Sequence, residues 1–323
     1  MNSSGALHPR VVYIGAPEAP AALFSQRARA DFPGIELLGT DDRAIALQNL
    51  ERAEALIGHH FQFDNDMLAH TPRLRWIQSL TTGTDGILKL PALRPEVTVT
   101  STRGMHGPQM SELVFLQMLA LLRNFPRIQR NQSEGRWERW PQPLLWGKTA
   151  VVVGVGAIAE ALAPRCQAFG MKVYGVSGST RIPPGFDSMF ARAELAKAAA
   201  LADFLILIVP LSASTENLID AKVLAAMKPG AYVVNVARGG VLDEEALIAA
   251  LDERRIAGAA LDVFREQPLP PTHPLWKHQG VIVTPLLGGM SDIYLDQAYD
   301  IVRFNLQHFL GGRLDAMRNI VPH

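Results

Sequence analysis

Short apolar runs alternate with longer segments of helical periodicity along the whole chain. In the first third, apolar runs bounded by Pro, Gly and Asp predict strands at residues 10–15, 55–58, 74–79 and 97–101. Apolar residues at helical spacing predict helices between them, at 18–30, 42–53 and 64–70. Strands that alternate with helices of this length favour a parallel sheet covered on both faces.

A second alternating series begins with TAVVVGVG at 149–156. Its further predicted strands are 171–176, 204–209, 232–236, 257–261 and 281–284. Before it, the segment 108–124 predicts a helix so apolar that another domain or subunit should bury it. A final helix near 291–311 can return to the first domain. These patterns predict an α/β protein with two doubly wound parallel-sheet domains.

Composition excludes several classes of protein. The 323 residues suggest two domains, and 31 basic residues balance 31 acidic ones, so neither nucleic acid nor a membrane is expected as a partner. No apolar run approaches the ~18 residues of a membrane helix. The N-terminus lacks the layout of a signal peptide, and the lone Cys166, expected in the core, cannot form an internal disulfide. A cytoplasmic protein without a metal site is the expectation.

The stretch VVVGVGAIAEALA at 151–163 reads as strand, tight turn and helix. Its pattern is G-x-G-x-x-A, in which Gly154 permits the turn, Gly156 lets a pyrophosphate approach the backbone, and Ala159 lets helix and strand pack closely. Glycines in such a turn can serve geometry alone. Because this turn follows a strand and opens a helix, it indicates a nucleotide site. We therefore predict a Rossmann dinucleotide-binding domain, residues 105–290, inserted in a flavodoxin-like domain formed by 1–104 and 291–323.

The end of the next strand bears on the choice of cofactor. An acidic residue is expected there to hold the adenosine ribose, but the position is Ser177 in MKVYGVSGSTR. A hydroxyl leaves room for a 2′-phosphate, with which Arg181 could pair. NADP is therefore favoured over NAD. The alternative is that Arg181 is a solvated loop residue and NAD binds.

Several further motifs occur in a familiar order. They are the loop SLTTGTDGI (79–87), the helix start GPQMSE, VPLSASTENLI (209–219) and VNVARGGVLDEEALIAALDERRIAGAALDVF (234–264). In this order they resemble the D-isomer-specific 2-hydroxyacid dehydrogenase family. The resemblance implies that the first domain binds substrate, and that the protein is a homodimer joined through the nucleotide domains. It also implies cofactor-binding roles for Ala157, Ile158, Val209, Pro210, Thr215, Ala237, Asp262 and Gly288.

The resemblance also assigns the chemistry. It implies that Arg238, in the ARG motif, grips the carboxylate and carbonyl of a 2-oxo acid, for which a guanidinium fork is well suited. Backbone amides near Thr82 and Gly83 would bind the same carboxylate. The family's catalytic glutamate and histidine correspond here to Gln267 and Leu286. Since a leucine side chain carries no proton, the usual acid–base group is missing.

Other residues could supply the proton. His106, in TRGMHGPQ, lies where the chain is expected to cross between domains, and it is the best substitute. His59 and His60 follow a predicted strand, and Tyr294 follows the GGMSD turn. Each of them could instead face solvent or cap backbone, and water could deliver the proton.

Three functions are compatible with these residues. The first is a nicotinamide-dependent oxidoreductase acting on a small 2-oxo or 2-hydroxy acid, with Arg238, Gln267 and His106 as candidate catalytic residues. The second is a catalytically impaired dinucleotide-binding protein that acts as a sensor or partner. The third is an enzyme whose substrate needs hydride but no acid–base group from the protein.

Overall fold

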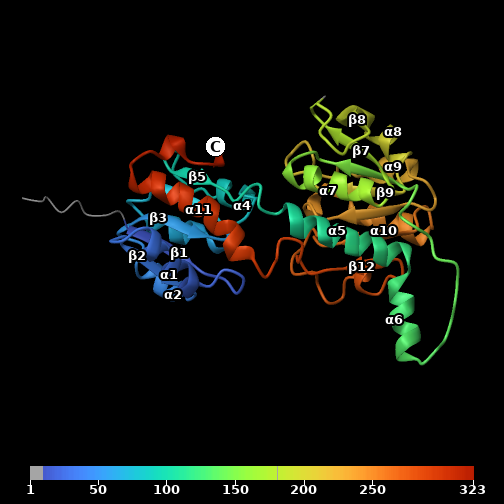
Figure 1. Cartoon of the computed structure of the whole chain (residues 1–323), viewed down its shortest axis with the longest axis horizontal. Coiled ribbons are helices and arrows are strands. Elements are labelled where there is room, and N and C mark those ends of the chain that lie inside the picture. Colours follow the sequence, from blue (N-terminus) through green and yellow to red (C-terminus); the bar gives the residue numbers. More distant parts are fainter. Residues whose placement is uncertain (1–9, 180) are drawn as a thin grey trace, which may run out of the picture. The chain divides into compact units, whose positions relative to one another are not determined.

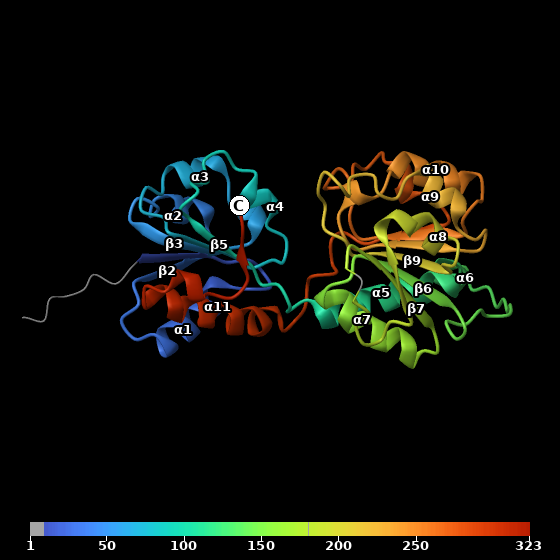
Figure 2. The same cartoon turned by 90° about the horizontal axis from the view of Figure 1, so that it is seen from above.

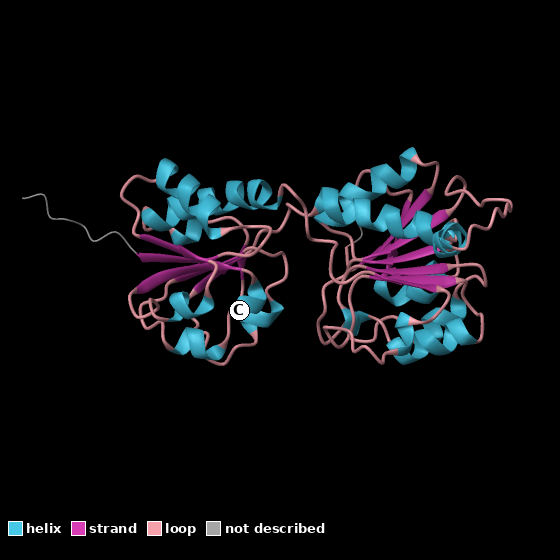
Figure 3. Ribbon diagram, turned by 90° about the horizontal axis from the view of Figure 1, so that it is seen from below, coloured by secondary structure: helices cyan, strands magenta, loops and turns pink. Residues whose placement is uncertain are grey.

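The structure is a computed structural model that describes residues 10–179 and 181–323. The chain divides into two compact units. One combines the chain up to Met105 with Met290–His323, and the other is His106–Gly289. In each unit a sheet lies between two layers of helices, which confirms the predicted fold class (Figure 1, Figure 3).

The first unit contains a six-stranded sheet in the order β13-β5-β4-β3-β1-β2. All neighbours pair in parallel except β13 with β5. The order 2-1-3-4-5 of its parallel strands is that of flavodoxin. The strands are β1 (Arg10–Ile14), β2 (Leu37–Thr40), β3 (Ala53–Gly58), β4 (Trp76–Ser79), β5 (Thr98–Thr100) and β13 (Ile320–Val321).

Helices cover both faces of this sheet (Figure 2). One face carries α1 (Ala21–Asp31) and α11 (Tyr294–Leu310). The other carries α2 (Arg43–Leu47), α3 (Asn65–Ala69) and α4 (Asp85–Leu88), and short 3₁₀ turns lie at η1 (His60–Gln62) and η5 (Leu314–Ala316). Aromatic rings fill the first face: Tyr13 stacks on Phe24 with ring centroids 3.8 Å apart, and Trp76 packs on Phe309. The last helix therefore completes the core of the first unit.

The second unit contains a seven-stranded sheet, all parallel, in the order β12-β11-β10-β9-β6-β7-β8. Strand β6 lies between β7 and β9, so the chain reverses its direction of sheet growth there. Ligands bind at such a switch point in Rossmann sheets. The strands are β6 (Thr149–Val153), β7 (Lys172–Ser177), β8 (Ser188–Ala191), β9 (Phe204–Leu207), β10 (Tyr232–Asn235), β11 (Gly258–Leu261) and β12 (Val281–Val283).

The helices of the second unit also form two layers (Figure 2). One layer holds α5 (Gly107–Leu122) and α7 (Ala157–Ala168). The other holds α8 (Leu195–Ala199), α9 (Ala221–Ala226) and α10 (Glu244–Asp252). Helix α6 (Phe125–Ser133) follows α5, and 3₁₀ turns lie at η2 (Arg192–Glu194), η3 (Gly239–Val241) and η4 (Pro274–Trp276).

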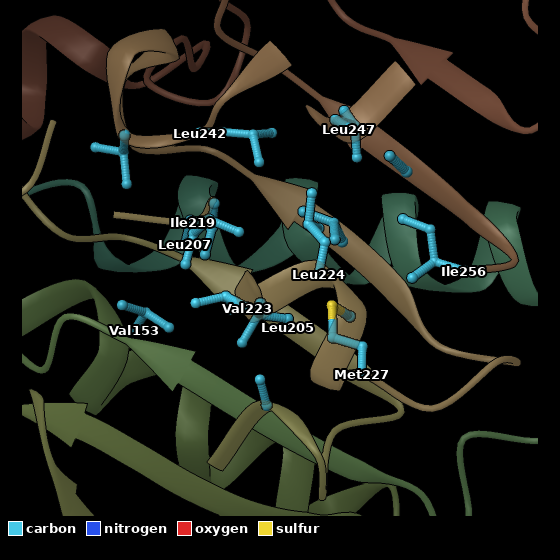
Figure 4. Packing of buried hydrophobic residues seen from close by; sticks show 14 of the residues in the cluster. Val153, Leu205, Leu207, Ile219, Val223, Leu224, Met227, Leu242, Leu247 and Ile256 are labelled. Atoms are coloured by element: carbon cyan, nitrogen blue, oxygen red, sulfur yellow. The ribbon is translucent and has the colours of Figure 1, made fainter. Parts of the chain in front are cut away.

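Aliphatic side chains fill both faces of the second sheet. Figure 4 shows one of these cores, which contains Leu205 and Leu207 of β9 together with Val223 and Leu224 of α9. Burial of such a leucine stabilises the fold by about 1.5–3 kcal/mol. Cys166 is fully buried in the core of the other face, as predicted, and burial raises the pKa of its thiol to about 12. No described helix is both long and apolar enough to cross a membrane.

The predictions that failed concern the margins of the sheets. Strands β2, β8 and β13 were not predicted, and all three lie at sheet edges. An edge strand is covered less completely, so its apolar pattern is weak; no residue of β8 is fully buried. The helix expected at 42–53 is only α2, because the chain turns and β3 already begins at Ala53. Helix α6 was also not predicted.

Candidate functional site

The turn between β6 and α7 is the first element of the site. Gly154 has φ +94°, in the left-handed region that favours glycine. A Cβ on Gly154 would lie 2.6 Å from the backbone nitrogen and Cα of Val209, so no side chain fits. Gly156 is extended, and a Cβ there would meet no atom within 4 Å. The protein therefore needs the first glycine for its own packing, whereas the second leaves space that a ligand can use.

Helix α7 begins at that space. Gly156 is its N-cap and provides no side-chain cap, and the Glu160 N–H donates to the Gly156 carbonyl at 2.9 Å. The N–H groups of Ala157 and Ile158 precede this bond and have no partner within the helix. Ala159 is fully buried, as close packing of the helix requires. Free amides at the positive end of a helix dipole suit a pyrophosphate.

A cavity of about 190 Å³ lies at the carboxyl ends of β6, β7 and β9. Its lining residues are Val153, Gly154, Val155, Val176, Ser177, Gly178, Arg192, Val209, Pro210 and Leu218. Four predicted cofactor positions therefore meet there: Gly154, Ser177, Val209 and Pro210. The other six lining residues, Val153, Val155, Val176, Gly178, Arg192 and Leu218, were not predicted as cofactor positions. Arg192 follows β8 directly, and β8 has too weak an apolar pattern to be predicted. The sequence therefore offers no reason to place Arg192 near this cavity.

Arg181 and Thr215 do not line this cavity. Arg181 is exposed, and its guanidinium lies 3.9 Å from the Glu160 carboxylate. Thr215 is buried; its hydroxyl donates to the Pro210 carbonyl at 2.7 Å and accepts from the Ser212 N–H. Thr215 thus stabilises the loop after β9. It would influence a bound ligand indirectly, by fixing the position of Pro210, which lines the cavity.

Arg238 follows β10 on a loop with little freedom. Asn235 holds this loop: its Oδ1 accepts from the Ala237 N–H at 3.1 Å, and its Nδ2 donates to the Arg238 carbonyl at 3.3 Å. A Cβ on Gly239 would lie 1.9 Å from the backbone of Phe264, so the loop runs directly against the segment that leads to Gln267. Asn235 was not among the predicted residues, although it stands in the VNVARGG motif. Close packing thus fixes where the Arg238 side chain begins.

Asp262 holds the loop that follows β12. Its carboxylate accepts from the Thr284 hydroxyl at 2.6 Å, from the Leu287 N–H at 2.9 Å and from the Gly288 N–H at 2.9 Å. Burial raises the pKa of Asp262, while these three hydrogen bonds act in the opposite direction. Because a buried donor left without its acceptor costs about 1–3 kcal/mol, Asp262 strongly stabilises this loop.

Leu286 lies within the loop that Asp262 holds. It adopts φ +57°, although the left-handed conformation costs a residue with a Cβ about 1–2 kcal/mol. Its N–H donates to the Asp262 carbonyl at 3.0 Å, and its side chain is half exposed. Gln267 is also exposed, on the segment after β11. The loop therefore presents residue 286 outward, but the side chain it presents carries no proton.

His106 lies beside this loop. It is the N-cap of α5, and its imidazole Nε2 is 3.7 Å from the place where a Cβ on Gly289 would lie. One turn further along α5, the Met110 sulfur lies 2.8 Å from the corresponding position on Gly288, which also contacts Asp262. The N-terminal end of α5 therefore packs against the loop 284–289. His106 lies at this contact, and its imidazole can donate or accept a proton.

The other candidate proton donors belong to the first unit. His59 is buried, with its Nε2 3.0 Å from the Glu18 carboxylate, and burial lowers its pKa. The buried Tyr294 hydroxyl donates to the Leu80 carbonyl, and burial raises the Tyr294 pKa. The His60 ring nitrogen lies 2.9 Å from the Thr81 hydroxyl. Burial therefore argues against proton transfer by His59 and Tyr294.

The loop predicted to bind substrate follows β4 in the first unit. The Thr81 hydroxyl donates to the Gly83 carbonyl at 2.8 Å and so closes a tight turn around Thr82, whose side chain is exposed. The turn thus leaves Thr82 at the carboxyl end of a parallel strand, where ligands bind in sheets of this kind. Among the described residues, no group of three or more His, Cys, Asp or Glu side chains could hold a metal ion.

A glycine turn at the switch point of a parallel sheet, with an open helix N-terminus and a cavity beside it, defines a dinucleotide-binding α/β protein. Residues 115–288, all within the second unit, match the family described as "D-isomer specific 2-hydroxyacid dehydrogenase, NAD binding domain". The chain belongs to this family, and it is an NAD(P)-dependent oxidoreductase of the class that acts on CH–OH groups.

Individual relatives agree with this assignment. A glyoxylate reductase of Thermococcus litoralis is 32% identical over 84% of this chain and 85% of its own length. A family protein of Aeromonas salmonicida has 31% identity and a TM-score of 0.88, covering 97% of this chain and 98% of its own. An NADPH-dependent glyoxylate/hydroxypyruvate reductase of Sinorhizobium meliloti, solved with NADP and sulfate, has 26% identity, a TM-score of 0.83 and coverage of 97% and 98%.

The two turn glycines should respond differently to alanine. Gly156→Ala adds a methyl group that meets no protein atom, so the melting temperature should stay unchanged while cofactor affinity falls roughly tenfold or more. Gly154→Ala forces a clash with Val209 and should lower the melting temperature. Fluorescence titration with NADPH and NADH, alongside thermal unfolding, measures both. Unchanged affinity of Gly156→Ala for both nucleotides would remove this turn from the cofactor site.

Proposed function

We propose that this protein reduces a small 2-oxo acid with NADPH. In this proposal His106–Gly289 is the dinucleotide-binding domain, and the chain up to Met105 with Met290–His323 is the substrate domain. The observation that carries it is Arg238, which the Asn235 hydrogen bonds and the contact of Gly239 with Phe264 hold in place. The Thermococcus and Sinorhizobium relatives are named for reduction of glyoxylate or hydroxypyruvate, which favours the same substrate class.

Arg238 would perform two tasks. Its planar guanidinium can bind a carboxylate through two parallel hydrogen bonds, and its charge polarises a neighbouring carbonyl. Backbone amides of the Thr82–Gly83 turn would bind the same carboxylate. A bound reduced nicotinamide supplies the hydride. The other cofactor positions, Ala157, Ile158, Ala237, Asp262 and Gly288, would hold the dinucleotide directly or fix the loops that do.

Besides the hydride, the carbonyl oxygen of the substrate needs a proton, and a side chain of this protein would supply it. Reduction of a carbonyl places negative charge on oxygen, and a positioned acid typically contributes ~10²–10⁴ in rate. Leu286 cannot act as an acid, and Gln267 does not ionise at neutral pH. His106 lies against the loop that carries Leu286, in the same unit, and we assign it as the proton donor. Gln267 would be left to orient substrate by hydrogen bonding.

NADP is proposed over NAD because of the end of β7. Ser177 occupies the position where a carboxylate would hold the ribose diol, and it lines the cavity. A carboxylate there would repel a 2′-phosphate, whereas a hydroxyl does not. The Sinorhizobium relative was solved with NADP, which supports the same choice.

A second candidate function follows from Leu286. A protonated imine already carries the proton that its reduction requires, so an iminium of a 2-oxo acid needs no acid from the protein. The leucine is held outward in the left-handed conformation by the Asp262 loop, a position where an acid–base side chain would otherwise stand. A reductase of such a substrate would still need Arg238 to bind the carboxylate, but Leu286 would not lower its rate because no acid is required at that position.

Steady-state NADPH oxidation with a panel of 2-oxo acids tests the proposal. We expect turnover by the native chain, and little rise in rate for the double change Gln267→Glu, Leu286→His, because His106 already supplies the proton. Leu287→His, an equally exposed neighbour, is the control and should not raise the rate. Activity only after ammonium is added would favour the second candidate. A native chain that binds NADPH but is inert under both conditions would contradict both reductase proposals.

His106 can be tested separately. His106→Asn should lower the rate of 2-oxo acid reduction by ~10²–10⁴ while cofactor affinity and melting temperature stay close to native values. The control is His278→Asn, which removes a histidine of the same unit that lies 3.6 Å from Asp252. Equal rates for the native chain and His106→Asn over the whole pH range would exclude His106 as the donor.

We also propose a homodimer formed through the second unit. Trp137 and Trp146 are 93% and 75% exposed, and Trp137 lines a surface hollow of about 490 Å³ with Ile128 and Trp140. Exposed tryptophans of this kind are typical anchors of protein interfaces. Trp137→Ser should therefore weaken the dimer in sedimentation at micromolar concentration. A native chain that sediments as a monomer at high concentration contradicts the proposal.

A further inference from the structure

Arg192 lies beside Ser177 at the end of the cavity where the adenosine of a dinucleotide binds in Rossmann sheets. The register of the sheet produces this neighbourhood. Ser177, the last residue of β7, pairs with Ala191, the last residue of the edge strand β8, and Arg192 is the next residue. Both side chains line the same cavity. The register of the sheet thus places the backbone of Arg192 next to Ser177.

The guanidinium is also anchored on its far side. Its Nη1 donates to the Ser214 hydroxyl at 3.0 Å, and the Ser212 hydroxyl lies 3.1 Å from that of Ser214. This loop is the one that the buried Thr215 hydroxyl shapes. One hydrogen bond occupies one of the five N–H donors of a guanidinium, so the remaining donors can bind a ligand.

Charge distinguishes Arg192 from Arg181. Across the residues that the structure describes, no carboxylate lies within ion-pair distance of Arg192. The guanidinium of Arg181 lies 3.9 Å from Glu160, and Arg181 does not line the cavity. An uncompensated guanidinium next to a ribose site that lacks a carboxylate favours an anion at that place.

We propose that Arg192, rather than Arg181, binds the 2′-phosphate of NADP(H). The inference rests on the proposed function only for the identity of the cofactor. Arg192, the first residue of η2, would bind the phosphate through its remaining N–H donors, and because Ser214 already holds Nη1 the side chain would lose few rotamers on binding. Hydrogen bonds from a charged guanidinium to a phosphate are roughly twice as strong as those between neutral groups.

Binding of nicotinamide-free nucleotides isolates this contact. Affinities for 2′,5′-ADP and 5′-AMP are measured by calorimetry on the full chain, for the native protein and for Arg192→Gln, Arg192→Lys and the matched control Arg181→Gln. The native chain should prefer 2′,5′-ADP by roughly 10- to 100-fold. Arg192→Gln should lose this preference with little change for 5′-AMP, Arg192→Lys should keep part of it, and Arg181→Gln should keep all of it.

Three results would overturn the inference, and they differ from failure of the proposed function. If Arg181→Gln loses the preference and Arg192→Gln keeps it, Arg181 binds the phosphate. If Arg192→Gln weakens both nucleotides equally, Arg192 contacts the adenine or the ribose instead. If the native chain shows no preference, no residue binds a 2′-phosphate and the NADP assignment falls as well. NADH oxidation with 2-oxo acids then decides separately whether reductase activity stands.

Discussion

The backbone of Gly154 passes so close to that of Val209 that a Cβ would lie 2.6 Å from two backbone atoms. This contact joins the end of β6 to the segment after β9, at the switch point of the sheet. It forces the chain into a left-handed turn that only glycine adopts readily, and the turn leads into α7, which packs on the sheet while its N-terminus stays open. The open N-terminus of α7 and the walls of the neighbouring cavity both follow from this single close contact.

A second constraint governs the chemical end of the same unit. The buried Asp262 carboxylate holds the backbone of residues 287 and 288 and the Thr284 hydroxyl, so the loop after β12 keeps its shape whatever side chain stands at position 286. Leu286 therefore occupies a position built for a displayed side chain, at the cost of a left-handed backbone. The glycine turn, the cavity and the Asp262 loop are all formed in this chain. The step of the reaction that Leu286 affects is therefore the transfer of a proton to the substrate.

Most of the fold was predictable from the sequence, because central parallel strands are buried on both faces and read as continuous apolar runs. β6, β9 and β10 are almost fully buried. The same reasoning explains the failures, since β2, β8 and β13 lie at edges and show little pattern. The omission of β8 affected the site, because the residue that follows it, Arg192, could not be placed next to Ser177. Arg181 is near Ser177 along the chain, so the sequence alone points to Arg181 as the partner of a 2′-phosphate.

The fold class, the glycine turn, the family motifs and the leucine at position 286 can all be read from the sequence alone. Each of these is a local pattern, carried by residues that are neighbours along the chain. Which residues from distant parts of the chain lie next to one another depends on the tertiary structure. Sheet register brings Arg192 to Ser177, and close packing brings His106 of α5 to Gly289. Such contacts depend on strand order and on how the helices cover the sheet. Both are set by packing between segments that are far apart along the chain, so they exist only in the complete folded unit.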